Sequence, residues 1–110
     1  MQTALAKYLA VLKPQVNLNA ANASEFGREL TTVINSEREA IVLVDMEKVE
    51  SLDSAGLMVL VSALSLSQRQ NQRFSLCSIS ASVRIVFELT QLDRVFEIFE
   101  SRTAFEAAIG

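Results

Sequence analysis

The sequence contains no histidine and no tryptophan, and it has one cysteine, one proline and three glycines in 110 residues. Without histidine there is no Ser-His-Asp or Cys-His catalytic set, no imidazole to bind a metal, and no ordinary acid–base group that titrates near neutral pH. The single cysteine, Cys77, cannot form an internal disulfide. Because its neighbours are apolar and strand-like, we expect Cys77 to be a small buried side chain without a redox role.

Charge and hydrophobic runs are also limited. The chain has 10 basic and 13 acidic residues and a net charge of −3, so its surface repels nucleic-acid phosphates. No apolar run approaches the roughly 18 to 20 residues of a membrane span, and the first ten residues lack the basic flank of a signal peptide. No Gly-rich phosphate loop is present. We therefore expect a cytoplasmic protein without nucleic acid, membrane, metal or cofactor as a ligand.

The composition supports one ordered domain spanning residues 1–110. Half of the residues are hydrophobic, which is enough for one core at this length. Proline and glycine are scarce and the charges are dispersed, so a disordered tail or linker has no compositional support.

Short apolar runs rich in β-branched residues predict the strands. The runs at residues 40–46 and 74–80 are continuous, as expected of strands covered on both faces of a mainly parallel sheet. Residues 95–99 form a shorter run, in which the polar Glu97 indicates a partly open face near the sheet edge. Before Asn22 the pattern fits either a helix followed by a strand or one interrupted strand with Pro14 at an edge. We favour a strand.

Helical periodicity separates these runs. One apolar face comprises Phe26, Leu30, Val33 and Ile34, after Asn22 or Ser24 as the N-cap. A second comprises Leu57, Leu60, Val61 and Leu64, and a third comprises Val83, Val86 and Phe87 after Ser80, widened by Ile85 and Leu89. A short fourth helix follows Ser101. Alternating strands and helices predict an α/β fold, with a mainly parallel sheet of about four to five strands and helices packed against it.

The segment Asp53-Ser54-Ala55-Gly56 stands where a predicted strand leads into a predicted helix. Ser54 can cap that helix by accepting a backbone N–H, and Gly56 lets another stretch of chain approach the first turn closely. The simplest interpretation of Ser54 is an N-cap. The four residues alone are common, and the longer context is more specific.

That context, VDMEKVESLDSAGLMVLVSAL, resembles the signature of the STAS family, in which Asp-Ser-x-Gly-Leu opens a helix after a strand that ends in an acidic residue. Upstream, LKPQVNLNAANASEF is similar to the family's entry into its first helix. Downstream, SLCSISASVRIVFELTQLDRVFEIF is similar to its later strand, helix and closing strand. The resemblance covers most of the chain and is greatest to stand-alone bacterial anti-sigma factor antagonists.

The resemblance implies a binding module and not an enzyme. In such antagonists the serine at the position of Ser54 is phosphorylated by an anti-sigma factor that is itself a serine kinase. The unphosphorylated form binds that kinase, and a PP2C-type phosphatase restores it. The implied partner-binding residues are Asn19, Asn22, Asp53, Ser54, Ala55, Gly56, Leu57 and Met58, in a monomer or weak dimer.

Several of these residues also have structural interpretations. Asp53 either orients the serine or stabilises the helix dipole. Met58 fits a place in the core as well as a place in the partner interface. Asn19 and Asn22 have the alternative roles of turn and capping residues. The chain departs from the family at Asn19, where an acid is frequent. It departs also at Val16, where glycine is frequent. The N-terminal segment is too short for the family's full opening hairpin, and this shortening leaves an edge strand that is either exposed or paired in a dimer.

Two other functions compete with the switch. An enzyme would use Ser54 as its nucleophile with Lys48 or Asp53 as the base, but Leu52 stands where a nucleophile elbow requires glycine. A phosphorylation-independent scaffold or ligand-binding adaptor would bind its partner equally well with alanine or aspartate at position 54.

Overall fold

The computed structural model describes residues 9–36 and 41–109, and its centre is one sheet of four parallel strands. In sheet order these are β1 (Leu9–Leu12), β2 (Ile41–Asp45), β3 (Arg73–Cys77) and β4 (Glu97–Phe99). Each strand pairs with the next one along the chain, in a register that places Leu9 opposite Ile41. This confirms the predicted α/β class and the parallel sheet.

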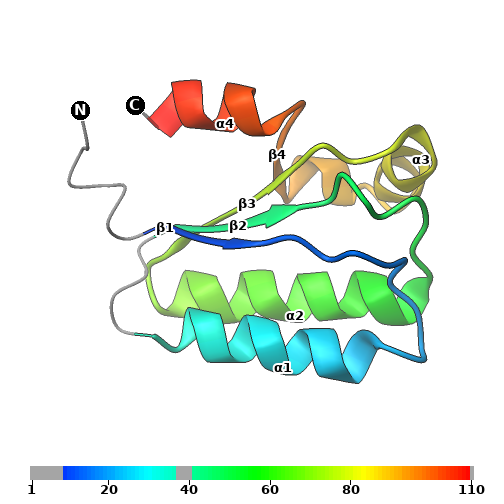
Figure 1. The fold of residues 1–110 in the computed structure, drawn as a ribbon, viewed down its shortest axis with the longest axis horizontal. Helices are drawn as coiled ribbons and strands as arrows, with labels where there is room; N and C mark the ends of the chain where they lie inside the picture. The colour runs from blue at the N-terminus through cyan, green and yellow to red at the C-terminus, as the bar shows by residue number, and fades with distance from the viewer. Residues whose placement is uncertain (1–8, 37–40, 110) are drawn as a thin grey trace.

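Helices connect the strands and cover both faces of the sheet (Figure 1). They are α1 (Ala23–Ile34), α2 (Ser54–Arg69), α3 (Ala81–Leu89) and α4 (Arg102–Ile109), and a short 3-10 turn, η2 (Leu92–Arg94), precedes β4. Figure 1 shows α1 and α2 side by side under the sheet, with α4 on the opposite face. Ser101 begins α4 by accepting the N–H of Ala104 through its hydroxyl, as the predicted fourth helix requires.

Alternation along the strands divides the core between the two faces. Val42, Val44 and Leu76 point into the larger cluster, which includes buried side chains from α1, α2 and α3. Ile41, Leu43 and Cys77 point to the other face and pack beneath Phe105 of α4. Strands buried on both sides have continuous apolar sequences, and for this reason β2 and β3 could be predicted from the sequence.

Cys77 is a free, buried thiol, as predicted. Burial raises the pKa of this thiol, so the reactive thiolate is disfavoured.

Three predicted details of these elements are wrong. The strand predicted to run to residue 80 ends at Cys77, because Ser78 turns the chain with a left-handed backbone, at a φ of 61°. Ile85 and Leu89 do not widen the buried face of α3, because they are 55% and 80% exposed and only Val83 and Phe87 of that helix are buried. Strand β4 begins at Glu97 and not at residue 95, because the N–H of Phe96 still bonds the carbonyl of Leu92 in the preceding turn. Glu97 lies at the sheet edge, as expected.

The N-terminal part confirms the preferred alternative where it is described. Leu9–Leu12 form the edge strand β1, and Pro14 follows the strand, where its missing N–H removes no ladder bond. The predicted shortened opening segment at residues 1–8 and the predicted strand start at residue 40 fall outside the described residues. None of the described helices is long and apolar enough to cross a membrane.

Candidate functional site

The segment around Ser54 lies at the edge of the sheet that is formed by the carboxyl ends of the parallel strands, and not beside the edge strands β1 or β4. α1 and α2 both begin at this edge (Figure 1), so their amino termini and the loops before them lie together. In α/β folds with open parallel sheets, this edge is the usual place for binding sites. We call the loops at residues 13–22, 46–53 and 78–80 the rim loops.

Asp53, and not Ser54, caps α2. The backbone of Asp53 is extended, and its carboxylate Oδ1 accepts the N–H of Gly56 at 3.0 Å. Ser54 is the first residue inside the helix. This corrects the predicted capping role of Ser54. Both residue types cap helices well, but the chain turns into helical geometry one residue earlier than the prediction required.

Asp53 also connects two rim loops. Its second oxygen, Oδ2, accepts the N–H of Ala20 at 3.1 Å. The hydrogen bond from Gly56 is the largest cause that lowers the pKa of Asp53, and the bond from Ala20 adds to it, although partial desolvation opposes both. Asp53 is therefore an anionic cap that holds the 13–22 loop against the start of α2.

Ser54 is exposed at the first position of a 16-residue helix. Its hydroxyl forms no hydrogen bond with any residue in the described part of the chain. The helix dipole and the N–H groups of the first turn favour an anion here, but Asp53 already occupies the N–H of Gly56. A phosphate on Ser54 would thus stand beside a carboxylate.

Leu18 lies against the first turn of α2 at Gly56. The N–H of Leu18 bonds the carbonyl of Ser51, and its carbonyl accepts the N–H of Asp53, so this part of the loop runs parallel to residues 51–53. A β-carbon at Gly56 would lie 2.8 Å from both the Cβ and the carbonyl oxygen of Leu18. Glycine is required here by close packing, and the segment that approaches it belongs to this chain.

Three asparagines organise the 13–22 loop. Asn22 precedes α1, but its side chain does not cap that helix; Oδ1 accepts the N–H of Asn19, and Nδ2 donates to the carbonyl of Asn17 at 2.7 Å. The Oδ1 of Asn19 accepts the N–H of Ala21. Asn19 and Asn22 therefore serve the turn, as one part of their structural interpretation predicted, whereas the predicted side-chain cap of Asn22 on α1 is not formed.

Asn17 and Ser80 fix the 46–53 loop, and sequence reasoning missed both roles. Asn17 Oδ1 accepts the N–H groups of Glu50 at 2.8 Å and Ser51 at 3.2 Å. Ser80 accepts the N–H of Val83 to cap α3, and its hydroxyl donates to the carbonyl of Glu50 at 3.1 Å. The repeated asparagines in NLNAAN were the available signal for Asn17. Hydrogen bonds of Asp53, Asn17 and Ser80 thus connect the three rim loops to one another. None of these bonds uses the hydroxyl of Ser54.

The family model that matches this chain is the STAS domain, over residues 3–104. The chain belongs to the STAS domain family. Its relatives include BtrV of Bordetella bronchiseptica, a candidate anti-sigma factor antagonist that is 35% identical over 92 residues, which are 83% of this chain and 78% of BtrV. A candidate anti-sigma factor antagonist of Thermotoga maritima is 33% identical over 94 residues, 84% of this chain and 82% of that protein.

Solved structures agree with this STAS fold. The crystal structure of a candidate anti-sigma factor antagonist from Thermotoga maritima superposes with a TM-score of 0.84 at 27% identity, over 91% of this chain and 86% of that one. The phosphorylated form of SpoIIAA, a Bacillus cell fate determinant, gives 0.74 at 14% identity, over 94% and 93%. The second likeness shows the fold alone. The STAS-like sheet and the general relationship to anti-sigma factor antagonists are therefore established.

The predicted site residues of this STAS domain divide by exposure. Asp53, Ser54 and Met58 are exposed, and Met58 is 57% exposed. Ala55, Asn19 and Asn22 are partly exposed. Gly56 and Leu57 are buried, so they pack inside the domain and a partner cannot contact them directly. The surface that a partner can reach at this edge is therefore formed by Ser54, its exposed neighbours Asp53 and Met58, and the tip of the 13–22 loop.

Proposed function

We propose that this STAS domain is an anti-sigma factor antagonist that binds an anti-sigma factor of the serine-kinase type and is released when Ser54 is phosphorylated. One observation carries the proposal: an exposed serine with a free hydroxyl begins α2 directly after a capping aspartate. Two relatives of this chain are candidate anti-sigma factor antagonists. SpoIIAA, which shares the fold, exists in phosphorylated and unphosphorylated forms.

The physical effect of the modification is local. A phosphate adds about 1.5 to 2 negative charges at Ser54, next to the carboxylate of Asp53. A partner that covers this edge would have to remove water from both groups. A differential cost of roughly 3 to 5 kcal/mol lowers affinity about 10² to 10⁴-fold, which is sufficient for a switch.

The fold accommodates this charge because Ser54 is exposed at the first position of α2, where the helix dipole favours negative charge. The rim loops are connected by Asp53, Asn17 and Ser80, none of which uses the hydroxyl of Ser54. Phosphorylation therefore changes the surface charge and leaves the loops in place. A PP2C-type phosphatase would restore the binding form, and the domain would act in the cytoplasm as a monomer or weak dimer.

The proposed role is binding and not catalysis. Asp53, one of the two residues considered as the base of an enzyme, accepts two backbone N–H bonds, and its lowered pKa makes it a weak base. Ester hydrolysis that disappears in Ser54→Ala would overturn this part of the proposal.

The experiment that tests the switch uses a cognate switch kinase, ATP and peptide mass spectrometry. We expect one phosphate, mapped to Ser54 and absent from Ser54→Ala. Ser82 is the matched control, since it is an exposed serine in the first turn of α3, and Ser82→Ala should be phosphorylated like the unaltered protein. If a kinase active on another substrate adds no phosphate at Ser54, the phosphorylation-independent adaptor takes its place.

A further inference from the structure

Two large apolar side chains lie on the outer side of α3, which Figure 1 shows at one end of the molecule. Ile85 is 55% exposed, and Leu89 is 80% exposed, the highest value among the large hydrophobic side chains of the described residues. They are four positions apart, so they lie next to each other on one side of the helix. The opposite side is buried through Val83 and Phe87. We call Ile85 and Leu89 the α3 stripe.

Two opposite charges follow the α3 stripe on one side only. Arg84 and Glu88 are both exposed, and the helical rotation of about 100° per residue places both on the same side of Ile85, one turn apart. The other side of the stripe has Ser82 and Val86, which carry no charge. In the part of the chain that the structure describes, neither Arg84 nor Glu88 forms an ion pair. The outer surface of α3 is therefore apolar, with one positive and one negative group along one flank.

We propose that the α3 stripe is the contact surface of a weak two-fold dimer, in which α3 packs antiparallel against α3 of a second copy of this chain. In such a pair each flank meets the same flank of the other helix, because the two helices run in opposite directions. With Ile85 opposite Leu89 of the second copy, Arg84 lies about 3 Å along the helix axis from Glu88 of the second copy, well within the reach of both side chains. Symmetry forms this ion pair twice.

The arrangement of the charges favours a second copy over other occupants of the α3 stripe. A partner surface of one charge sign, acidic or basic, would repel either Glu88 or Arg84. A parallel helix pair would place the charged flank against Ser82 and Val86 of the second copy and leave both charges without partners. The antiparallel pair of two copies satisfies both charges and covers both apolar side chains.

The size of the surface determines the strength of the dimer. α3 has nine residues, so it is about 13 Å long. Stable complexes bury about 800 Å² on each partner, which is more than one short helix supplies. We therefore expect a dissociation constant of roughly 0.1 to 1 mM. The inference goes beyond the proposed function, because neither Ser54 nor phosphorylation takes part in this contact.

The test reverses one charge at a time in the full chain and follows amide shifts of ¹⁵N-labelled protein up to about 1 mM. The unaltered protein should show concentration-dependent shifts centred on Ile85 and Leu89. Arg84→Glu makes the flank wholly acidic and Glu88→Arg makes it wholly basic, so each variant alone should dimerise at least about five-fold more weakly. When labelled Arg84→Glu is mixed with unlabelled Glu88→Arg, both ion pairs form again, and the shifts at α3 should return with at least the unaltered affinity.

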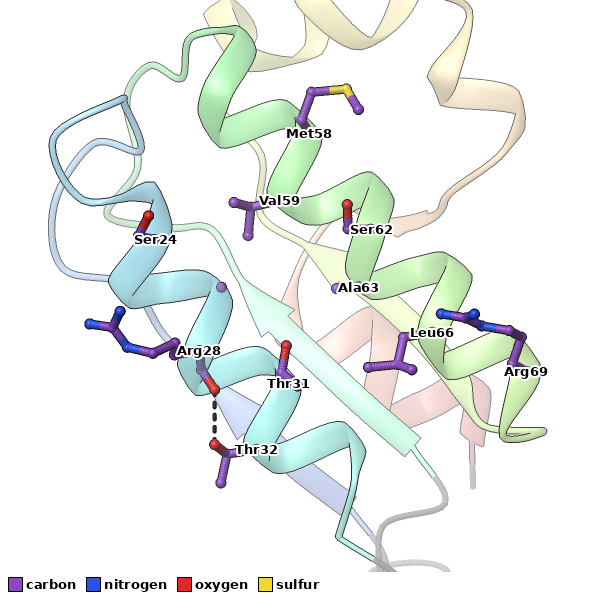
Figure 2. A pocket seen from close by; sticks show the side chains of 11 residues that line it. Ser24, Arg28, Thr31, Thr32, Met58, Val59, Ser62, Ala63, Leu66 and Arg69 are labelled. Atoms are coloured by element: carbon purple, nitrogen blue, oxygen red, sulfur yellow. Dashed lines mark hydrogen bonds between the residues drawn. The ribbon is translucent and has the colours of Figure 1, made fainter.

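The matched control makes the same charge changes on α1, with Arg28→Glu and Glu29→Arg. Both residues are exposed, and Figure 2 shows Arg28 on the outer side of α1, pointing away from α2. Each control variant should dimerise within about two-fold of the unaltered protein, since distant exposed charges are screened. Mixing the two control variants should not strengthen the association.

Leu89→Gln tests the apolar part of the contact. The side chain is exposed, so circular dichroism should show an unchanged fold while dimerisation weakens at least about five-fold. Shifts at α3 that do not depend on concentration in the unaltered protein would overturn the proposal. A mixture of Arg84→Glu and Glu88→Arg that associates no better than either variant alone would also overturn it. If Leu89→Gln instead loses affinity for the switch kinase while the unaltered chain stays monomeric, the α3 stripe belongs to the kinase and not to a second copy.

Discussion

Gly56 in the first turn of α2 lies against Leu18 of the loop before α1, so closely that a β-carbon on Gly56 would be 2.8 Å from the carbonyl oxygen of Leu18. Real β-carbons do not approach a backbone oxygen this closely, and the backbone cannot rotate away as a flexible side chain can. The contact sets the position of the 13–22 loop next to Ser54. The glycine of Asp-Ser-Ala-Gly is thus a packing requirement.

Replacing Gly56 by alanine should destabilise the domain. Alanine favours a helix over glycine by about 1 kcal/mol, but the displaced Leu18 backbone should cost more, for a net loss of about 1 to 3 kcal/mol in the free energy of unfolding. Urea denaturation measures this difference. Gly27→Ala is the matched control, because its β-carbon meets Val59 at an ordinary 3.7 Å. Gly27→Ala should leave stability unchanged or raise it by about 0.5 to 1 kcal/mol; a stability loss in Gly27→Ala equal to that in Gly56→Ala would contradict the packing explanation.

The capping role of Asp53 predicts a dependence of stability on pH. The hydrogen bonds from Gly56 and Ala20 keep the pKa of Asp53 in the folded chain below its ordinary value of 3.8. The unfolded chain therefore binds this proton more tightly than the folded chain. The stabilisation is complete well above pH 3.8 and is lost as the pH falls through the lower folded pKa.

Asp53→Asn removes this titration. The amide oxygen still accepts the N–H of Gly56, but the amide nitrogen cannot accept the N–H of Ala20. Unfolding by urea between pH 7 and pH 3 should show a shallower loss of stability with acid than in the unaltered chain. Carbon-detected NMR gives the pKa of Asp53 directly; a value at or above 3.8 would contradict the hydrogen-bonded cap.

The sequence predicted the sheet and α2 because their signals are local. β2 and β3 are continuous apolar runs, and the spacing of Leu57, Leu60 and Leu64 identifies the buried face of α2. The cap of α2 was assigned wrongly to Ser54, because aspartate and serine are both good N-caps and adjacent in the chain. Only the direction of the backbone at Asp53 decides between them.

Asn17 illustrates what local patterns cannot supply. Its side chain accepts two N–H groups from residues more than thirty positions away, Glu50 and Ser51. Asn17→Ala should lower the free energy of unfolding by about 1 to 2 kcal/mol and speed amide hydrogen exchange at Glu50 and Ser51. Asn17→Asp retains acceptor oxygens and should keep most of the protection. Unchanged exchange in the alanine variant would show that these bonds do not hold the loop.

Ser78 predicts a stabilising substitution. It follows β3 with a φ of 61°, in the left-handed region that L-residues other than asparagine and aspartate seldom occupy. Ser78→Gly removes the clash of the β-carbon and should raise the free energy of unfolding by about 1 kcal/mol in thermal or urea denaturation. Ser80→Gly, two residues later, removes a cap and a bond to Glu50 and should have the opposite effect. Destabilisation by Ser78→Gly would show that its side chain contributes more than the strain costs.

The exposure of Ile85 and Leu89 also could not be predicted from the sequence. Both fit the apolar spacing of α3, yet the helix buries only the arc that contains Val83 and Phe87. Periodicity indicates that a helix has an apolar side, but the neighbouring elements determine how wide an arc they cover.

The affinity of a cognate switch kinase for three forms of this domain tests the central claim most directly. Calorimetric titration would compare the unmodified protein, the protein phosphorylated at Ser54, and Ser54→Ala. The account predicts tight binding of the first and third forms, and an affinity of the phosphorylated form that is lower by at least about 100-fold, or about 2.7 kcal/mol. Equal affinity of all three forms, with the phosphate verified by mass, would contradict the switch and identify the domain as a phosphorylation-independent adaptor.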